Sequence, residues 1–150
     1  MFNLFKKQND SRKIAEKAFK TKDPFKAVEL YSDSIKFEKE KDRPDNNFLS
    51  ELYLLRGEIY LKQGVATLSS SDFLQAIEFN PKNGIAHNDL GFWFTISHFN
   101  TPDYDKALEH IEKAVEYCPE RLDFKMNRAI IKINKGEKDI GRKELEQLII

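Results

Sequence analysis

Three histidines, one cysteine and a run of serines are the residues here whose types could support catalysis or metal binding. No two of His87, His98 and His110 are three or four residues apart, the spacing that places a pair of metal ligands on one helix face. The run Ser69-Ser70-Ser71 has no base at a spacing typical of an activated nucleophile. We therefore expect no catalytic residue, no metal site and no cofactor, and we do not expect an enzyme.

The glycines and the cysteine also argue against a chemical site. The six glycines are scattered singly, whereas a phosphate-binding loop gathers several of them. Cys118 is the only cysteine, so the chain can form no internal disulfide, which fits a reducing compartment. It directly precedes Pro119 at an expected helix end, and we interpret it as a packing residue.

The composition is that of a globular chain with one domain's length. The 150 residues include 25 basic and 25 acidic side chains, so no overall field attracts nucleic acid, and we expect no nucleic-acid partner. The stretch from Met1 to Lys26 is mildly basic, which is typical of a solvated helix face. No apolar run is long enough for a transmembrane segment or a signal peptide. We therefore expect a soluble, cytoplasmic protein.

A pattern of small residues recurs four times along the chain and predicts the architecture. Each copy has a small residue, then a second small residue, a large apolar residue and a further packing position. The first positions are Ala15, Gly57, Gly91 and Ala129, and the second are Ala27, Ser69, Ala107 and Gly141. Small side chains at these places let two antiparallel helices approach closely, and the large residue fills the space beside them.

The second and third copies resemble the tetratricopeptide repeat. The resemblance is carried by Arg56-Gly57-Glu58-Ile59-Tyr60, by Phe73, by the run Ala76–Pro81 and by the similar run Ala114–Pro119. It implies an all-α fold, a right-handed α-solenoid of four stacked helix-turn-helix repeats. The repeats would span residues 8–41, 50–83, 84–121 and 122–150, after an N-terminal extension of residues 1–7, within a single domain covering residues 1–150.

Local signals predict where the helices begin and end. Asp23-Pro24 and Thr101-Pro102 each resemble an N-cap followed by proline at the first helical position. Gly64 and Gly136 fall where the first helices of the second and fourth repeats should end. The second helix of the second repeat is the least secure, because Thr67–Ser71 has poor helix propensity.

The resemblance also implies a binding face, which would be concave and lined by the first helix of each repeat. We expect it to hold a peptide or helix of a partner protein, as in an adaptor. Its predicted residues are Arg12, Glu16, Leu54, Glu58, Leu61, Asn88, Asp89, Phe92, Met126 and Ile130; the matching positions Phe19, Thr95 and Ile133 belong to the same face. Packing between repeats is the alternative role; it is favoured for Ile130 and Ile133, and both roles stay open for Phe92 and Met126.

Charge on this face bears on the kind of ligand. One branch of the family holds acidic chaperone tails with a clamp of Lys, Asn and Arg, but Glu16, Glu58 and Asp89 lie near where such groups would be needed. We therefore expect a ligand with basic and apolar residues in place of an acidic tail.

Two alternatives to groove binding follow from the ends of the chain. The C-terminal residues Leu145, Leu148, Ile149 and Ile150 form a candidate oligomer edge, because a solenoid normally ends in a polar capping helix. This edge would make the protein a self-associating scaffold subunit, a homo-oligomer. The third hypothesis is a regulator that binds an anionic surface through the basic N-terminal end.

Overall fold

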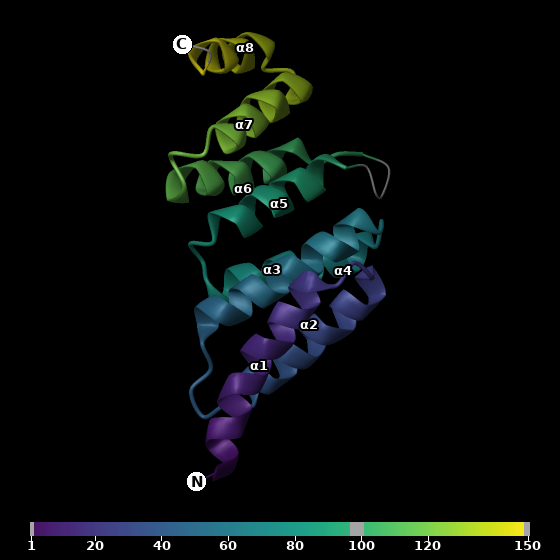
Figure 1. The fold of residues 1–150 in the computed structure, drawn as a ribbon. Coiled ribbons are helices and arrows are strands. Elements are labelled where there is room, and N and C mark those ends of the chain that lie inside the picture. The colour runs from purple at the N-terminus through teal and green to yellow at the C-terminus, as the bar shows by residue number, and fades with distance from the viewer. Residues whose placement is uncertain (1, 97–100, 149–150) are drawn as a thin grey trace. The chain divides into compact units, whose positions relative to one another are not determined.

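The computed structural model describes residues 2–96 and 101–148, and this part of the chain is built from α-helices alone (Figure 1). The predicted all-α fold is confirmed. The helices are α1 (Phe2–Lys20), α2 (Pro24–Lys39), α3 (Asn46–Lys62), α4 (Ala66–Phe79), α5 (Gly84–Thr95), α6 (Tyr104–Tyr117), α7 (Leu122–Lys135) and α8 (Lys138–Gln147). No helix in the described part is long and apolar enough to cross a bilayer.

The local signals place most helix ends correctly. The carboxylate of Asp23 accepts hydrogen bonds from the backbone N–H groups of the first turn of α2, with Pro24 at the first helical position. Gly64 follows the C-cap of α3 with φ 73°, and Gly136 caps α7 with φ 111°. The predicted start of α6 at Thr101-Pro102 is wrong. Asp103 is the N-cap, because its side chain accepts from the N–H of Lys106.

Consecutive helices pack as antiparallel pairs, α1 with α2, α3 with α4, α5 with α6 and α7 with α8. In the α3–α4, α5–α6 and α7–α8 pairs, a glycine lies where the two helices approach closely. A Cβ atom on Gly91 would lie 3.1 Å from the carbonyl oxygen of Ala107, and one on Gly57 would lie 2.8 Å from the ring of Phe73. α4 forms despite its weak propensity because Phe73 and Ala76 are fully buried.

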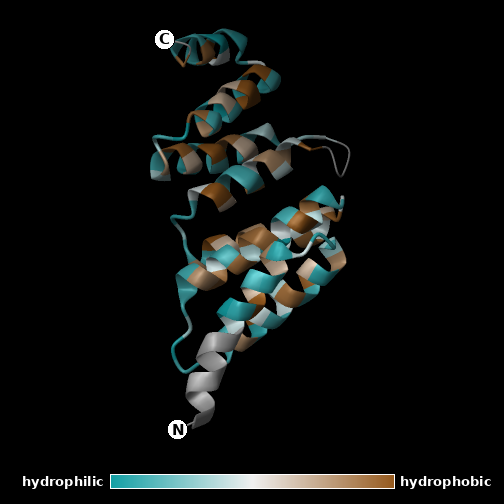
Figure 2. Ribbon diagram, in the orientation of Figure 1, coloured by the Kyte–Doolittle hydropathy of each residue, from teal (hydrophilic) through white to brown (hydrophobic). Residues whose placement is uncertain are grey.

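The chain divides into two compact units, Met1–Pro81 and Lys82–Ile150. Leu49, Leu52 and Phe73 are fully buried in the first unit. The second has a core cluster formed by Ala107, Leu108, Ile111, Ala114, Phe124 and Ile131. Within each unit, apolar and polar stretches alternate along the helices (Figure 2), as helices with one buried face require. The organisation of residues 1–150 as a single domain stays a prediction.

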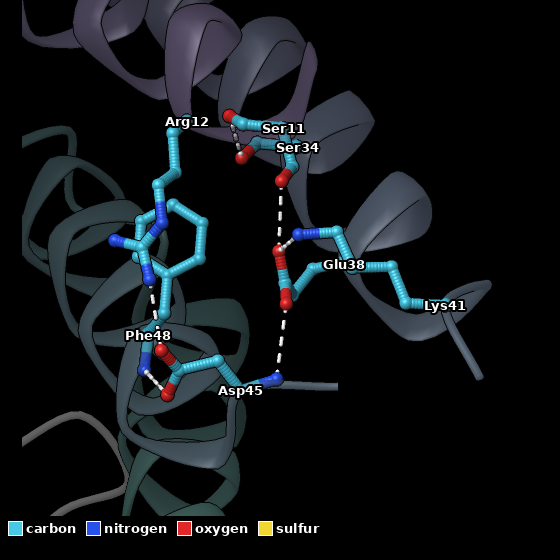
Figure 3. Close-up of polar contacts among 7 residues, drawn as sticks. All are labelled: Ser11, Arg12, Ser34, Glu38, Lys41, Asp45 and Phe48. Carbon is cyan, nitrogen blue, oxygen red and sulfur yellow. Dashed lines mark hydrogen bonds and ion pairs between the residues drawn. The ribbon is translucent and has the colours of Figure 1, made fainter. Parts of the chain in front are cut away.

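A buried carboxylate ties the first three helices together (Figure 3). The Glu38 side chain is 1% exposed; it accepts from the Ser11 hydroxyl at 2.7 Å and from the Asp45 backbone N–H at 3.0 Å, and it pairs with Lys41. The Ser34 hydroxyl donates to the carbonyl of Ser11 at 2.6 Å. These bonds fix α1 against α2 and hold the start of α3 beside both.

A second buried ion pair joins α2, α3 and α4. The Arg56 guanidinium makes two hydrogen bonds of 2.7 Å to the Asp72 carboxylate, and its third contact is the Ser32 hydroxyl at 2.8 Å. The Asp72 side chain is 6% exposed. A paired, planar geometry of this kind compensates the cost of burying both charges.

Candidate functional site

The second unit contains a hollow of about 230 Å³ between α5 and α7. Its floor includes Ile111 and Ile131, which are 0% and 4% exposed. Two predicted site residues lie beside this floor: Phe92 is 50% exposed and Ile130 is 45% exposed. Large apolar side chains are usually buried. Phe92 and Ile130, together with the apolar floor, therefore form an exposed apolar surface that another apolar group could cover.

Neutral polar side chains surround the hollow. Asn88, Thr95, Asn127 and Asn134 line it, and none of its lining residues is charged. The amide of Asn127 donates to the side-chain oxygen of Asn88 at 2.9 Å, which fixes two of these groups relative to each other. Amides both donate and accept hydrogen bonds, so they can pair with the backbone of an extended peptide. The hollow therefore combines an apolar anchor point with partners for a peptide backbone.

The other predicted residues of this unit lie outside the hollow. Met126 is 46% exposed on α7. Asp89 is half-buried and accepts from the amide of Asn88 at 3.0 Å. The structure thus brings Asn88, Phe92 and Ile130 together, and it does not place Met126 or Asp89 among the residues that line the hollow.

In the first unit, two hollows adjoin Phe19, which is 75% exposed. Arg12 and Glu16 line the one between α1 and α3, and Glu58 lines the other. Arg12 is already engaged: it pairs with Asp45 at 2.8 Å, and its guanidinium lies 4.2 Å from the centroid of the Phe48 ring. Figure 3 shows this arrangement, in which Arg12 joins α1 to the start of α3.

The structure corrects the interpretation of Leu54. Its side chain is only 6% exposed, so it is a packing residue and does not line an open binding face. Leu61 is half-buried. At the candidate oligomer edge, Leu145 and Leu148 are also half-buried, and Ile149 and Ile150 lie outside the described residues.

Sequence reasoning missed Asn127 and Asn134 as lining residues. The signal was present in the spacing: Asn127, Ile130 and Asn134 follow one another at intervals of three and four residues, which places them on one face of α7. An asparagine beside an apolar residue is easily interpreted as solvated, because the sequence does not show a hydrogen-bond partner on another helix. For Asn127, that partner is Asn88 on α5.

The described residues include a pair of histidines but no candidate metal site. No group of three His, Cys, Asp or Glu side chains there could hold a metal ion. His87 and His110 do contact each other, with 3.0 Å between their Nδ1 atoms. Burial first, and then the neighbouring His87, lowers the pKa of His110 to about 4. This pair joins α5 to α6 within the aromatic packing of Phe94 and Tyr117.

Comparison with known proteins identifies the repeat. A family model of the tetratricopeptide repeat matches residues 50–83, the segment that contains α4 and most of α3. No curated protein matches the chain. Among solved structures, the chain is similar to MamA, with a TM-score of 0.75 and 17% identity over 95% of this chain and 78% of that one.

Two further structures are similar. The Arabidopsis OM64 TPR domain has a TM-score of 0.70 and 21% identity, over 85% of this chain and 98% of that one. The first TPR of Spaghetti (RPAP3), bound to the HSP90 peptide SRMEEVD, has a TM-score of 0.68 and 17% identity, over 83% of this chain and 92% of that one. Together, these findings show that residues 50–83 match the tetratricopeptide repeat and that the chain shares the helical fold of these repeat structures.

Proposed function

We propose that the chain is a protein-interaction module, an adaptor that binds a peptide or helical segment of another protein through the first helices of its repeats. The observation that carries this proposal is the hollow between α5 and α7, where Phe92 and Ile130 are about half exposed beside a buried apolar floor. Exposed apolar side chains around a concavity are typical of peptide-binding surfaces.

The lining indicates the chemistry of the ligand. An apolar side chain of the ligand would contact Phe92 and Ile130, and the amides of Asn88 and Asn127 would pair with its backbone. No cation lines this hollow, so an acidic tail such as the SRMEEVD peptide bound by the Spaghetti (RPAP3) domain would find no counter-charge there. In the first unit, the exposed carboxylate of Glu16 favours a basic residue in the ligand.

Selection from a displayed random peptide library tests the proposal. We expect the selected peptides to share an apolar residue, and we expect Phe92→Ala and Ile130→Ala each to weaken their binding by about tenfold, as truncation of an interface anchor does. Nuclear magnetic resonance should show that the side-chain amide signals of Asn88 and Asn127 shift when peptide is added.

Ile140→Ala is the matched control, because Ile140 is 52% exposed on α8 and does not line the hollow. It should leave peptide binding unchanged. Peptides that bind the Phe92→Ala and Ile130→Ala variants as tightly as the original chain would exclude this hollow as the binding site.

The alternative function is a self-associating scaffold subunit. It is supported by the last helix, where Ile140 is half exposed and Leu145 and Leu148 are not fully buried. Light scattering over a range of concentrations separates the two functions. A mass that stays monomeric excludes the scaffold, and an oligomer that Leu148→Asp dissociates would favour it over the adaptor.

A further inference from the structure

The turn between α1 and α2 presents two aromatic side chains to solvent. Phe19 is 75% exposed and Phe25 is 77% exposed, the largest values among the big apolar side chains described from residue 11 onward. They lie on either side of the turn, one in the last helical turn of α1 and the other in the first turn of α2. Such side chains protrude from the surface, and packing within the unit does not account for them.

Lysines surround the two rings. Lys17, Lys20 and Lys22 are exposed, and Lys26 is exposed while pairing with Glu29 at 2.8 Å. The only acid within residues 17–26 is Asp23, whose carboxylate is occupied in capping α2. The tip therefore has an excess of positive charge, although the chain as a whole is neutral.

The end of α3 extends this surface. Lys62 lines the same hollow of about 290 Å³ as Phe19 and Lys22, together with the carboxylate of Glu58. Beyond Lys62, Val65 and Leu68 at the start of α4 are 39% and 46% exposed. Apolar groups and ammonium groups thus occur together on the α1, α2 and α3 ends of the first unit.

We propose that this basic aromatic tip, residues 17–26 with Lys62, docks on the surface of a bilayer that contains anionic phospholipids. Phe19 and Phe25 enter the boundary between headgroups and acyl chains. The lysine stems lie along that boundary while their ammonium groups pair with lipid phosphates. The apolar and the electrostatic contributions come from the same few residues, and weak membrane anchors typically need both.

Two features favour a bilayer over another macromolecule. Side chains that are three-quarters exposed can insert into a fluid interface, whereas a folded partner would need a pocket shaped for each of them. Every cation of the tip is a lysine, which acts as a point charge toward phosphate and lacks the planar fork with which arginine grips nucleic acid. The tip belongs to the first unit and the α5/α7 hollow to the second, so the two proposals fail independently.

Vesicle flotation of the full chain tests the proposal. We expect the chain to float with vesicles of phosphatidylcholine and phosphatidylserine. With vesicles of phosphatidylcholine alone, it should remain at the bottom of the gradient. Phe19→Ser and Phe25→Ser should each lower the partition coefficient by about tenfold, the effect of withdrawing one large apolar side chain from the interface. Lys20→Glu should lower it at least fivefold, and added salt should weaken binding by the original chain.

Leu122→Ser and Lys138→Glu are matched controls, because they remove an exposed apolar side chain and an exposed lysine from the second unit. Both should float as the original chain does, and circular dichroism should show unchanged helix content in all variants. No flotation with anionic vesicles would overturn the proposal. Unchanged flotation of the two phenylalanine variants would also overturn it. So would a result in which these variants still bind heparin but the chain does not bind vesicles.

Discussion

At the scale of single residues, buried polar side chains stabilise the packing of this protein because each has a defined partner. Burial alone would raise the pKa of Glu38, but hydrogen bonds from Lys41, from the Asp45 backbone and from Ser11 outweigh it and hold the pKa below its ordinary value. Glu38 therefore remains ionised at neutral pH. A carboxylate held in this way specifies one arrangement of α1, α2 and the start of α3, since any other arrangement leaves a buried charge unpaired.

The histidine pair of the second unit favours the neutral form of a buried side chain, whereas the contacts of Glu38 favour its charged form. The Nδ1 atoms of His87 and His110 lie 3.0 Å apart, so one must donate and the other accept, and protonation of His110 would turn two N–H groups toward each other. Burial and the neighbouring His87 accordingly lower the pKa of His110 from 6.5 to about 4. The ring also stacks on Phe94, with 5.7 Å between centroids.

The first prediction concerns the pH dependence of stability. Between pH 6.5 and about 4 the unfolded chain binds a proton at His110 that the folded chain does not. The stabilisation is therefore complete above pH 6.5 and is lost as the pH falls toward 4, by on the order of 2–3 kcal/mol. Urea unfolding at pH 7.5 and pH 5 measures this change.

His110→Phe provides the control for this prediction. It should cost about 1 kcal/mol at pH 7.5, because His87 loses a hydrogen-bond partner. It should also flatten the dependence between pH 7.5 and pH 5. An unchanged pH dependence in the variant would show that groups other than His110 cause the loss.

At the scale of helices, the close approach of paired backbones depends on small residues such as glycine. A Cβ atom on Gly141 in α8 would lie 2.5 Å from the carbonyl oxygen of Ala129 and 2.6 Å from a side-chain carbon of Ile133, both in α7. Backbone atoms cannot move aside as a flexible side chain can. The α7–α8 pair should therefore tolerate no larger residue at this position.

The second prediction is that Gly141→Ala destabilises the protein, although alanine is the better helix former by about 1 kcal/mol. We expect a net loss of about 1–3 kcal/mol in the free energy of unfolding, because the added methyl group forces α7 and α8 apart. Arg142→Ala, at an exposed position of the same helix, should change stability by no more than about 0.5 kcal/mol. A Gly141→Ala variant more stable than the original chain would contradict the packing seen here.

Signals that act within a helix correctly located most of the helix ends for which the sequence analysis used them. Gly64 and Gly136 end α3 and α7 as expected, because a positive φ is a local property that glycine supplies. The start of α6 could not be separated from Thr101-Pro102 by sequence alone, since Asp103 was an equally good cap two residues later.

The binding face was predictable only in part, for a physical reason. The family resemblance put Phe92 and Ile130 on the binding face, although packing between repeats was the favoured role for Ile130. Both side chains are about half exposed beside one hollow. Spacing could not show that Leu54 is buried or that Arg12 is held by Asp45 and Phe48, because those outcomes depend on side chains from other segments. Periodicity specifies the face of a helix, and tertiary packing decides how much of that face stays open.

At the scale of the whole molecule, cooperativity between the two compact units decides whether they behave as one domain. Repeat proteins gain stability from each interface between neighbouring repeats, so a change in one repeat is felt along the stack when the interfaces are intact. We propose that residues 1–150 fold as a single cooperative domain. The sequence provides a built-in probe, because Trp93 is the only tryptophan and lies in the second unit.

The third prediction uses that probe with a substitution in the other unit. Leu49 is fully buried in the first unit, and Leu49→Ala should lower the free energy of unfolding by about 2–5 kcal/mol. In a single cooperative domain, urea unfolding followed by Trp93 fluorescence and by far-ultraviolet circular dichroism should coincide, and the substitution should move both midpoints equally. If the circular dichroism signal becomes biphasic while the Trp93 midpoint stays fixed, the two units unfold separately. The binding surface on α5 and α7 would then operate independently of the basic aromatic tip.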